Sequence, residues 1–516
     1  MFICNRVSIT LKNGNQLVEN LNLVLNDGDK LALIGEEGNG KTTLLKCFYD
    51  PLLVEPYALY QGQQNLVSDE IAYLPQALED EWLEKTTLDF LLQKELDSEK
   101  DFDIYHHFFD VEKLFHTFDL DLDLLEHPRL IKTLSGGEKI KLQLVKLFMT
   151  KAKLFLLDEP TNDIDIETIA IFESVIKQIN TPIIFISHDE MLLSHVANQI
   201  LHLEQIKRQK LAKFNYEKIG YQDYIAMRKR QISQHNRDAY RTQKDYDKRR
   251  LTLMHQHLLV ENDLDRANGN QPSLGRLLAK KMRNVKSQEK KLSEMEVLDY
   301  YREEEAMNLF FDDSVSLPNG KVILDLTLDR LVAGDKELAK NIELKIVGPE
   351  HIAIIGINGS GKTTLIRQIL NDLKTKVGIH VGYMPQDYHE LLDPSMSAVE
   401  YLQSKLGYET TLKSQIMTFL GALNFIEREM ISPISTLSSG LKAKLYLLEL
   451  VMAKNDVIVL DEPTRNLSPL SSPVVRMILN KFKGAIIMVT HDRTLIHEVA
   501  TTTYLLTKDG LSKSII

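Results

Sequence analysis

Two stretches of the sequence decide the fold: GEEGNGKT over residues 35–42 and GINGSGKT over residues 356–363. Each directly follows a short apolar run, Leu31–Ile34 in the first case and Ile352–Ile355 in the second. Glycines let the backbone wrap closely around phosphate groups, and a helix that begins at the lysine offers free N–H groups and the positive end of its dipole. The pattern G-x-x-x-x-G-K-T between a strand and a helix therefore predicts two phosphate-binding loops.

The two loops belong to a repeat that spans most of the chain. Four further motifs occur twice in the same order: Tyr-x-Pro-Gln at 73–76 and 383–386, Leu-Ser-x-Gly at 134–137 and 437–440, Leu-Asp-Glu-Pro-Thr at 157–161 and 460–464, and His-Asp at 188–189 and 491–492. The last three pairs are each 303 positions apart. Order and spacing repeat together, so the chain contains two domains of one kind.

Unbroken apolar runs predict the central strands of each domain. Besides the two already given, these runs are residues 154–157, 183–186, 457–460 and 486–489. Strands that are apolar on both faces belong to sheets covered by helices on both sides. The sequence therefore predicts an α/β fold: two P-loop nucleotide-binding domains with largely parallel sheets, over 1–204 and 308–516, joined by a helical hairpin linker over 205–307.

The chemistry of a phosphate loop assigns roles to its residues. Lys41 and Lys362 are expected to reach the β- and γ-phosphates of ATP, and the hydroxyls of Thr42 and Thr363 to coordinate Mg²⁺. The other ATP contacts expected in the loops are Gly35, Gly38, Gly40 and Thr43 in the first and Gly356, Gly359, Gly361 and Thr364 in the second. Glu37 is expected to weaken ATP binding at the first site, because a carboxylate repels a polyphosphate.

An Asp-Glu pair closes a buried strand in each domain, at the sheet edge where α/β proteins bind ligands. The aspartates, Asp158 and Asp461, are predicted to hold Mg²⁺. The glutamate of each pair is predicted to orient and polarise the attacking water, and the histidine after the next strand to contact the γ-phosphate or that water. The predicted catalytic residues are Glu159, Glu462, His188 and His491.

These motifs resemble those of the ATP-binding-cassette (ABC) superfamily, whose signature is Leu-Ser-Gly-Gly. Residues 134–137 match it, and Ser135 with Glu138 also fits a helix capping box. In that family the signature of one domain contacts the γ-phosphate held by the loop of the other domain. The resemblance implies two ATP sandwiches, which would join Lys41, Asp158 and Glu159 with Ser438 and Gly440, and Lys362, Asp461 and Glu462 with Ser135 and Gly137.

The same resemblance adds further site residues. Gln76 and Gln386 match the glutamines of the family's Q-loop, which implies contacts to ATP and Mg²⁺, and Gly136 and Ser439 complete the signature contacts. The second signature reads LSSGL over 437–441 and lacks one glycine and the capping glutamate, so the first site is expected to close or turn over differently. Neither domain has an aromatic residue at the usual adenine-stacking position, which leaves the adenine contacts unassigned.

Composition restricts the class of protein further. The 516 residues are 43% hydrophobic and 26% charged, typical of a globular chain of more than one domain. Cys4 and Cys47 form neither a zinc pattern nor a disulfide framework. The sequence shows no N-terminal signal segment and no apolar run of about 20 residues, so we expect a cytoplasmic protein without a membrane span.

The charge distribution singles out the segment between the domains. Residues 205–300 contain 22 Lys+Arg against 12 Asp+Glu, whereas the whole chain has a net charge of −11. Two helices are predicted, over 207–250 and over 273 to about 305, with a turn near 262–272. Local positive charge in an acidic chain predicts a contact with nucleic-acid phosphates. The densest basic strip, and the predicted RNA contact, is Arg276, Lys280, Lys281, Arg283 and Lys286.

Within the superfamily the chain resembles the ABC-F branch, tandem ATPases that act on the ribosome. The run PTRNLSPL over 463–470 is similar to that of ABC-F proteins that confer antibiotic resistance, and the 58 positions from Gln76 to Leu134 leave no room for the arm hairpin of housekeeping members. The resemblance implies a monomer whose paired domains dock at the E site of the 70S ribosome, with the linker reaching 23S rRNA, the P-site tRNA and the peptidyl-transferase centre. Two alternatives stay open, the ATPase subunit of a membrane importer and a housekeeping ABC-F factor without a resistance role.

Overall fold

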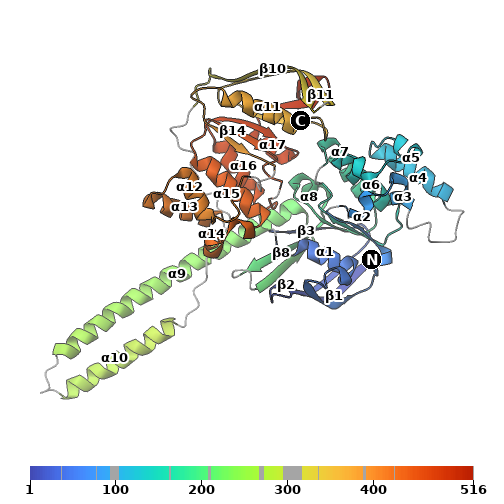
Figure 1. The fold of residues 1–516 in the computed structure, drawn as a ribbon. Coiled ribbons are helices and arrows are strands. Elements are labelled where there is room, and N and C mark those ends of the chain that lie inside the picture. The colour runs from blue at the N-terminus through green and yellow to red at the C-terminus, as the bar shows by residue number, and fades with distance from the viewer. Residues whose placement is uncertain are drawn as a thin grey trace. The chain divides into compact units, whose positions relative to one another are not determined.

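The computed structural model shows two compact units, one made of Met1–Tyr221 with Glu304–Ile516 and the other of Gln222–Glu303 (Figure 1). The structure describes residues 1–36, 38–76, 78, 80–92, 104–161, 164–206, 211–266, 272–293, 317–334, 336–386, 391–423, 425–465 and 467–514. The larger unit contains both copies of the repeat. The smaller unit is helical.

Each copy of the repeat is built on a six-stranded sheet. The order in the first is β5-β6-β7-β3-β8-β9, and in the second β13-β14-β15-β12-β16-β17. All neighbours are parallel except the last pair of each sheet, β8–β9 and β16–β17. The strands are β3 (Lys30–Gly35), β5 (Ile71–Leu74), β6 (Leu154–Asp158), β7 (Ile183–Ile186), β8 (Gln199–Ile206), β9 (Leu211–Glu217), β12 (His351–Ile355), β13 (Val381–Met384), β14 (Val457–Asp461), β15 (Ala485–Val489), β16 (Thr502–Thr507) and β17 (Gly510–Ser514).

Smaller antiparallel sheets complete the strand inventory of the described residues. The first copy has β1 (Phe2–Leu11), β2 (Gln16–Leu25) and β4 (Ala58–Gln64) in the order β2-β1-β4, and the second has β10 (Val322–Ala333) paired with β11 (Lys336–Val347). The six predicted central strands are confirmed as β3, β6, β7, β12, β14 and β15. Every residue of these strands is buried, as expected for strands covered on both faces.

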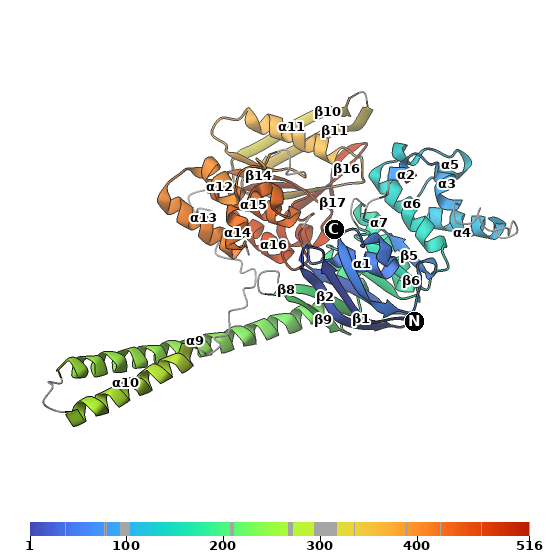
Figure 2. The ribbon, with the colours of Figure 1, turned by 60° about the horizontal axis from the view of Figure 1, so that its bottom comes forward.

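Helices surround both sheets (Figure 2). Those of the first copy are α1 (Lys41–Tyr49), α2 (Asp80–Leu83), α3 (Thr87–Leu92), α4 (Ile104–Thr117), α5 (Asp123–Glu126), α6 (Gly136–Met149), α7 (Ile166–Gln178) and α8 (Glu190–Val196). Those of the second are α11 (Lys362–Lys374), α12 (Ala398–Leu406), α13 (Thr410–Ala422), α14 (Glu427–Ile431), α15 (Ser439–Met452), α16 (Ser472–Lys481) and α17 (Arg493–Val499). The α/β fold class predicted from the repeat is confirmed.

The apolar core fixes the helix that follows each phosphate loop. In the first copy Leu44 and Leu45 of α1 pack in one cluster with Leu31 and Leu33 of β3. In the second copy the buried face of α11 joins the cluster of β12 in the same way. The start of each helix is therefore held against the carboxyl end of a central strand.

The smaller unit is a helical hairpin, with α9 over Tyr221–Arg266 and α10 over Pro272–Ser293. The two helices lie side by side in both views (Figures 1 and 2). His257 of α9 pairs with Glu289 of α10, with 2.8 Å between Nδ1 and Oε1, so the helices run antiparallel in contact.

The helix predicted over 207–250 is wrong at its beginning. Residues Leu211–Glu217 form β9, which pairs with β8, and the helix begins only at Tyr221. Alternating apolar and polar residues suit a strand at a sheet edge, a pattern that the charged residues on either side obscured. The helix also continues through the predicted turn to Arg266. Residues 267–271 of that turn and residues beyond 293 in the second predicted helix lie outside the described residues.

Candidate nucleotide sites

The phosphate loops have the same backbone geometry in both copies. Gly40 and Gly361, the residues directly before α1 and α11, have φ angles of 86° and 99°, in the left-handed region. A Cβ atom on Gly361 would lie only 2.9 Å from Cδ1 of Leu338, and one on Gly40 would lie 2.8 Å from Cδ1 of Leu17. A residue with a side chain would be strained at this φ and would clash with the leucine. Glycine avoids both, so the N–H groups at the start of the helix can face a ligand.

Each loop lysine folds back over its own loop. Nζ of Lys41 donates to the carbonyl oxygen of Gly35 at 2.8 Å, and Nζ of Lys362 donates to that of Gly356 at 2.8 Å. Burial lowers the pKa of Lys362, although nearby carboxylates act in the opposite direction. The ammonium group lies at the mouth of the loop, where a phosphate group would meet it.

The two aspartates predicted to bind metal are almost completely buried, Asp158 at 1% exposure and Asp461 at 2%. Thr42 Oγ1 donates to Oδ1 of Asp158 at 3.1 Å. Burial raises the pKa of Asp158 to about 6 and also raises that of Asp461. Within the described residues, Oδ2 of each aspartate is buried without a hydrogen-bond partner. A buried, unsatisfied carboxylate oxygen beside a threonine hydroxyl fits a hard cation such as Mg²⁺.

The glutamate after each aspartate has a strained backbone. Glu159 and Glu462 both have φ of 52°, a left-handed conformation that is uncommon for a residue with a side chain. Their N–H groups donate to Ile186 and Val489 of the neighbouring strands, at 3.1 and 2.9 Å. Such strain costs on the order of 1 kcal/mol and clusters at functional sites. The same outlier at equivalent positions shows that the backbone turns in the same way after β6 and after β14.

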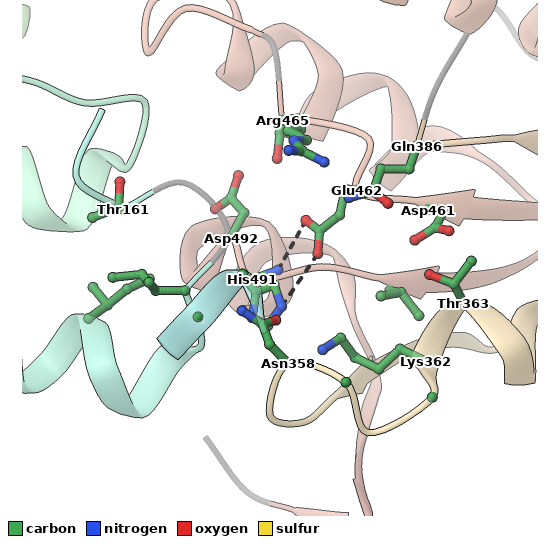
Figure 3. Close-up of a pocket in the computed structure, with 18 of the residues that line it drawn as sticks. Thr161, Asn358, Lys362, Thr363, Gln386, Asp461, Glu462, Arg465, His491 and Asp492 are labelled. Carbon is green, nitrogen blue, oxygen red and sulfur yellow. Dashed lines mark hydrogen bonds and ion pairs between the residues drawn. The ribbon is translucent and has the colours of Figure 1, made fainter. Parts of the chain in front are cut away.

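A histidine faces each of these glutamates. Nε2 of His188 lies 3.0 Å from Oε1 of Glu159, and in the second copy the His491 N–H donates to Oε2 of Glu462 at 3.3 Å (Figure 3). Burial raises the pKa of Glu462 to about 8 and lowers that of His491 to about 4. Burial thus disfavours the charged forms of both groups, and a carboxylate with a raised pKa is the stronger proton acceptor once it is ionised.

A cavity of about 490 Å³ lies in front of the second phosphate loop, a volume in the range of small-molecule sites. Figure 3 shows Lys362 and Glu462 facing each other and Thr363 next to Asp461, with Gln386 also in the lining. The first copy contributes Gly136, Gly137, Thr161, Ile164, Ile169, His188 and Asp189 to the lining. The structure thus brings signature glycines of one copy to the phosphate loop of the other, the arrangement expected for an ATP sandwich.

The signature serines have local hydrogen-bond partners. Ser135 Oγ donates to Glu138 at 2.6 Å and accepts from the Glu138 N–H at 3.3 Å, which confirms the predicted capping box. Ser438 caps α15 by accepting from the Leu441 N–H at 3.3 Å. The contacts predicted for Ser135, Ser438, Ser439 and Gly440 with a phosphate group stay predictions.

The first phosphate loop contacts the second copy through a glutamate side chain. Oε1 of Glu36 accepts hydrogen bonds from Ser468 at 3.1 Å and from Ser471 at 3.4 Å. The corresponding residue of the second loop is Ile357, which cannot make such a bond. The two sites therefore differ in the structure. Glu37, to which the sequence attributes a weaker first site, lies outside the described residues.

Several residues that line the second site had no role predicted from the sequence: Thr161, Asp189, Leu338, Arg465 and Asp492. Thr161, Asp189 and Asp492 belong to the repeated motifs. Arg465 belongs to the PTRNLSPL run, so a signal for it existed. No sequence signal pointed to Leu338, because a leucine in a strand of alternating polar and apolar residues predicts only that its side chain packs in the core. The Leu338 side chain lies beside Gly361 and adds an aliphatic surface to the lining of the cavity.

Comparison with known proteins agrees with this geometry. Residues 18–162 and 339–465 match the family model described as ABC transporter. The chain belongs to this family, carries its ATPase domain twice in tandem, and has relatives in the ABC-F branch. Domains of this family hydrolyse ATP, and the chain is an ATPase. Within the described residues, no helix is both long and apolar enough to cross a membrane.

The relatives are similar over nearly the whole of this chain and about four-fifths of their own length. The chain is 28% identical to the ATP-binding protein Uup of Buchnera aphidicola subsp. Schizaphis graminum, over 96% of this chain and 79% of that protein. It is 26% identical to the ribosome protection protein VmlR of Bacillus subtilis, over 96% of this chain and 85% of that protein.

Solved structures of tandem ABC proteins share the fold. The RNase-L Inhibitor matches with a TM-score of 0.56 at 16% identity, over 98% of this chain and 90% of that one. An archaeal ribosome recycling factor, aABCE1, solved with the ribosomal stalk protein aP1, matches with a TM-score of 0.57 at 17% identity, over 96% and 86% of the two chains.

Changing Glu462 to Gln removes the carboxylate that faces His491 and keeps its size. We expect ATP hydrolysis to fall on the order of 100-fold at this site while ATP still binds, because only the proton acceptor is lost. Single-turnover hydrolysis together with binding of a fluorescent ATP analogue measures both effects. Glu343→Gln, at an exposed position of β11, is the matched control. Because Glu159 leaves the first site active, the comparison is made in a Glu159→Gln background, where hydrolysis that Glu462→Gln does not lower would contradict the role.

Proposed function

We propose that the chain is an ATP-driven ribosome-binding protein of the ABC-F branch, which docks at the E site, directs its hairpin towards the P-site tRNA and the peptidyl-transferase centre, and protects the ribosome from antibiotics. The observation that carries the proposal is the basic hairpin that interrupts an acidic tandem ATPase. The likeness to a relative named as a ribosome protection protein supports it.

The charge of the hairpin is concentrated on its second helix. Helix α10 carries seven Lys+Arg and one glutamate, Glu289, within 22 residues. Arg276, Lys280 and Arg283 recur at helical spacing and form one exposed stripe. Lys281 and Lys286 are exposed beside it. Such a stripe can follow a sugar–phosphate backbone, whose attraction requires several cations in a row.

The hairpin is long and internally supported. Forty-six residues of α9 extend about 70 Å at 1.5 Å per residue. Leu253 on α9 and Val285 on α10 are buried, and the His257–Glu289 pair joins the two helices. Because the two helices support each other, the hairpin resists bending and can transmit a displacement along its length, which an isolated polar helix could not.

Apolar side chains are exposed on both helices near the turn. They are Leu258 and Leu259 on α9 and Leu274 and Leu277 on α10, between 40% and 53% exposed. Exposed leucines beside cations suit unstacked RNA bases, which present an apolar face and a charged backbone together. We propose that this end of the hairpin contacts 23S rRNA and the P-site tRNA.

At each ATP site we propose roles that follow the geometry. The loop lysine binds the β- and γ-phosphates, the threonine and the aspartate hold Mg²⁺ together with Gln76 or Gln386, and the glutamate accepts a proton from the attacking water. When bound, Mg²⁺ would neutralise charge that develops on the phosphates. His188 and His491 contact the γ-phosphate or the attacking water beside these glutamates.

ATP can drive a conformational change only through contacts that differ between two states. The second cavity is lined by both copies, so a nucleotide bound there contacts both and favours their pairing. We propose that ATP binding closes the copies for docking in the E site and that hydrolysis releases the protein from the ribosome in the cytoplasm.

The double variant Glu159→Gln with Glu462→Gln should hold ATP without hydrolysing it. We therefore expect it to accumulate on 70S ribosomes in the presence of ATP, at least about tenfold above the wild-type protein, because release requires hydrolysis. Co-sedimentation through a sucrose cushion measures this. A variant that pellets with membranes and a permease instead would favour the importer ATPase and overturn the proposal.

The basic stripe can be tested by the triple variant Arg276→Gln, Lys280→Gln and Arg283→Gln. Each lost phosphate contact should weaken ribosome binding and reduce the dependence of log affinity on log salt concentration by nearly one unit. The matched control is Lys340→Gln, Lys345→Gln and Lys508→Gln, three exposed lysines of the second copy. Equal effects of the two triple variants would show that the stripe has no specific role.

Protection from antibiotics is tested by drug susceptibility. A strain that expresses the protein should tolerate at least one class of drug that binds near the peptidyl-transferase centre, and the triple variant of the stripe should lose this tolerance. Unchanged susceptibility to every such drug, with ribosome binding intact, would leave a housekeeping ABC-F role as the function.

A further inference from the structure

Five charged side chains join the two copies of the repeat, two arginines from the second copy and three carboxylates from the first. Arg476 of α16 makes a two-pronged contact with Glu190 of α8, with Nη1 2.7 Å from Oε1 and Nη2 3.1 Å from Oε2. Arg493, the first residue of α17, donates through Nη2 to Glu173 of α7 at 2.5 Å. Arg493 Nη2 also donates to Asp189 at 3.0 Å. These helices come from opposite copies, so each pair crosses between them.

The partners occupy equivalent places in the repeat. Arg476 lies 303 positions after Glu173, and Arg493 lies 303 positions after Glu190, the same offset as the catalytic motifs. At both places the first copy has a glutamate and the second an arginine. The copies pack with approximate twofold symmetry, so the residue at each of these places contacts the residue at the other place in the opposite copy. Both contacts therefore join a glutamate to an arginine.

The side chains are largely withdrawn from solvent. Their exposures are 5% for Arg476, 10% for Arg493, 10% for Glu173 and 16% for Glu190. Buried charges are costly unless they are paired, so such pairs add little stability, but a mismatched pair is strongly unfavourable. Arg493 is also a cation at a helix N-terminus, which its own helix dipole disfavours. The carboxylates of the other copy therefore stabilise the charge of Arg493 at this position.

We propose that the two arginines and the two glutamates form a charge-complementary interface that determines which ATPase domains pair: the acidic surface of α7 and α8 fits the basic surface of α16 and α17 and rejects a second copy of itself. Two first domains would bring Glu173 against Glu190, and two second domains would bring Arg476 against Arg493. Either self-pairing buries like charges. The partner of each domain is therefore the other domain, and the covalent linkage makes the one on the same chain the nearest.

Additional side chains fit the same scheme. Glu498 accepts from Arg476 Nε at 2.8 Å within the second copy, and His195 lies 2.9 Å from Glu173 within the first. They too stand 303 positions apart, so each cluster contains a further ionisable side chain at an equivalent position. Asp189, which accepts from Arg493, also lines the nucleotide cavity. The interface therefore adjoins the site where the nucleotide bridges the domains.

The decisive experiment is a charge reversal with rescue in the full-length chain. Arg476→Glu places three carboxylates together, at positions 190, 476 and 498. We expect the equilibrium between paired and separated domains to shift roughly 100-fold towards separation, and ATP turnover to fall about tenfold or more. Adding Glu190→Arg restores one arginine between two glutamates, and we expect both quantities to return to within about threefold of the wild-type values.

Domain separation can be followed by energy transfer between dyes on Lys177→Cys and Lys481→Cys, both at exposed positions. The native Cys4 and Cys47 are buried and should not react. Circular dichroism shows whether each variant is folded. Arg129→Glu is the matched control, because it reverses an exposed pair with Asp123 inside the first copy and should change nothing.

Each outcome decides the question. Rescue by Glu190→Arg supports charge complementarity, since a merely structural defect would not be repaired by a second reversal. If Arg476→Glu leaves energy transfer and turnover unchanged, the pairs do not hold the domains together. If the double variant is no better than the single one, the effect comes from packing. Either of these two results would overturn the proposal.

Discussion

The structure depends on a pair of carboxylates buried at the end of a central strand, once in each copy of the repeat. Burial of a carboxylate is unfavourable, and it raises the pKa of Asp158 to about 6 and that of Glu462 to about 8. The fold keeps these groups where they are with a left-handed backbone and a threonine hydroxyl. Elements that supply positive charge surround them: a lysine, the N-terminus of a helix and, as we propose, Mg²⁺.

The nucleotide chemistry and the pairing of the domains meet at adjacent residues. His188, Asp189 and Glu190 follow β7, and His491, Asp492 and Arg493 follow β15. The histidine faces Glu159 or Glu462, the aspartate caps a helix and lines the cavity, and the third residue pairs across the copies. The lining of the cavity and the contacts that join the domains therefore lie within three residues of each other along the chain.

The repeat is not symmetric in its charges. The interdomain contacts use glutamates in one copy and arginines in the other, and Glu36 of the first loop has Ile357 as its counterpart. Two identical domains would have two equivalent sites and could pair with copies of themselves. Because the two copies differ at these positions, one nucleotide site can be distinguished from the other, and one domain partner from the other.

Much of the fold and of the site could be predicted from the sequence. The six central strands were correct because residues buried on both faces form unbroken apolar runs. The positions of the phosphate loops and acidic pairs followed from motif spacing, since the chemistry of a phosphate loop restricts its residue types locally. The hairpin was less well predicted, because β9 has the composition of its charged surroundings and its pairing with β8 is a tertiary contact.

Sequence alone therefore determined that there are two ATPase domains, where their phosphate loops lie and where the positive charge lies. Only the tertiary structure decided the strain at Glu159 and Glu462, the aliphatic surface at Leu338 and the pairing of Arg476 with Glu190. Local motifs are read from neighbouring residues, whereas these features arise between residues up to 286 positions apart that meet only after folding. The repeat offset showed which positions are equivalent, and the folded interface showed that they face each other.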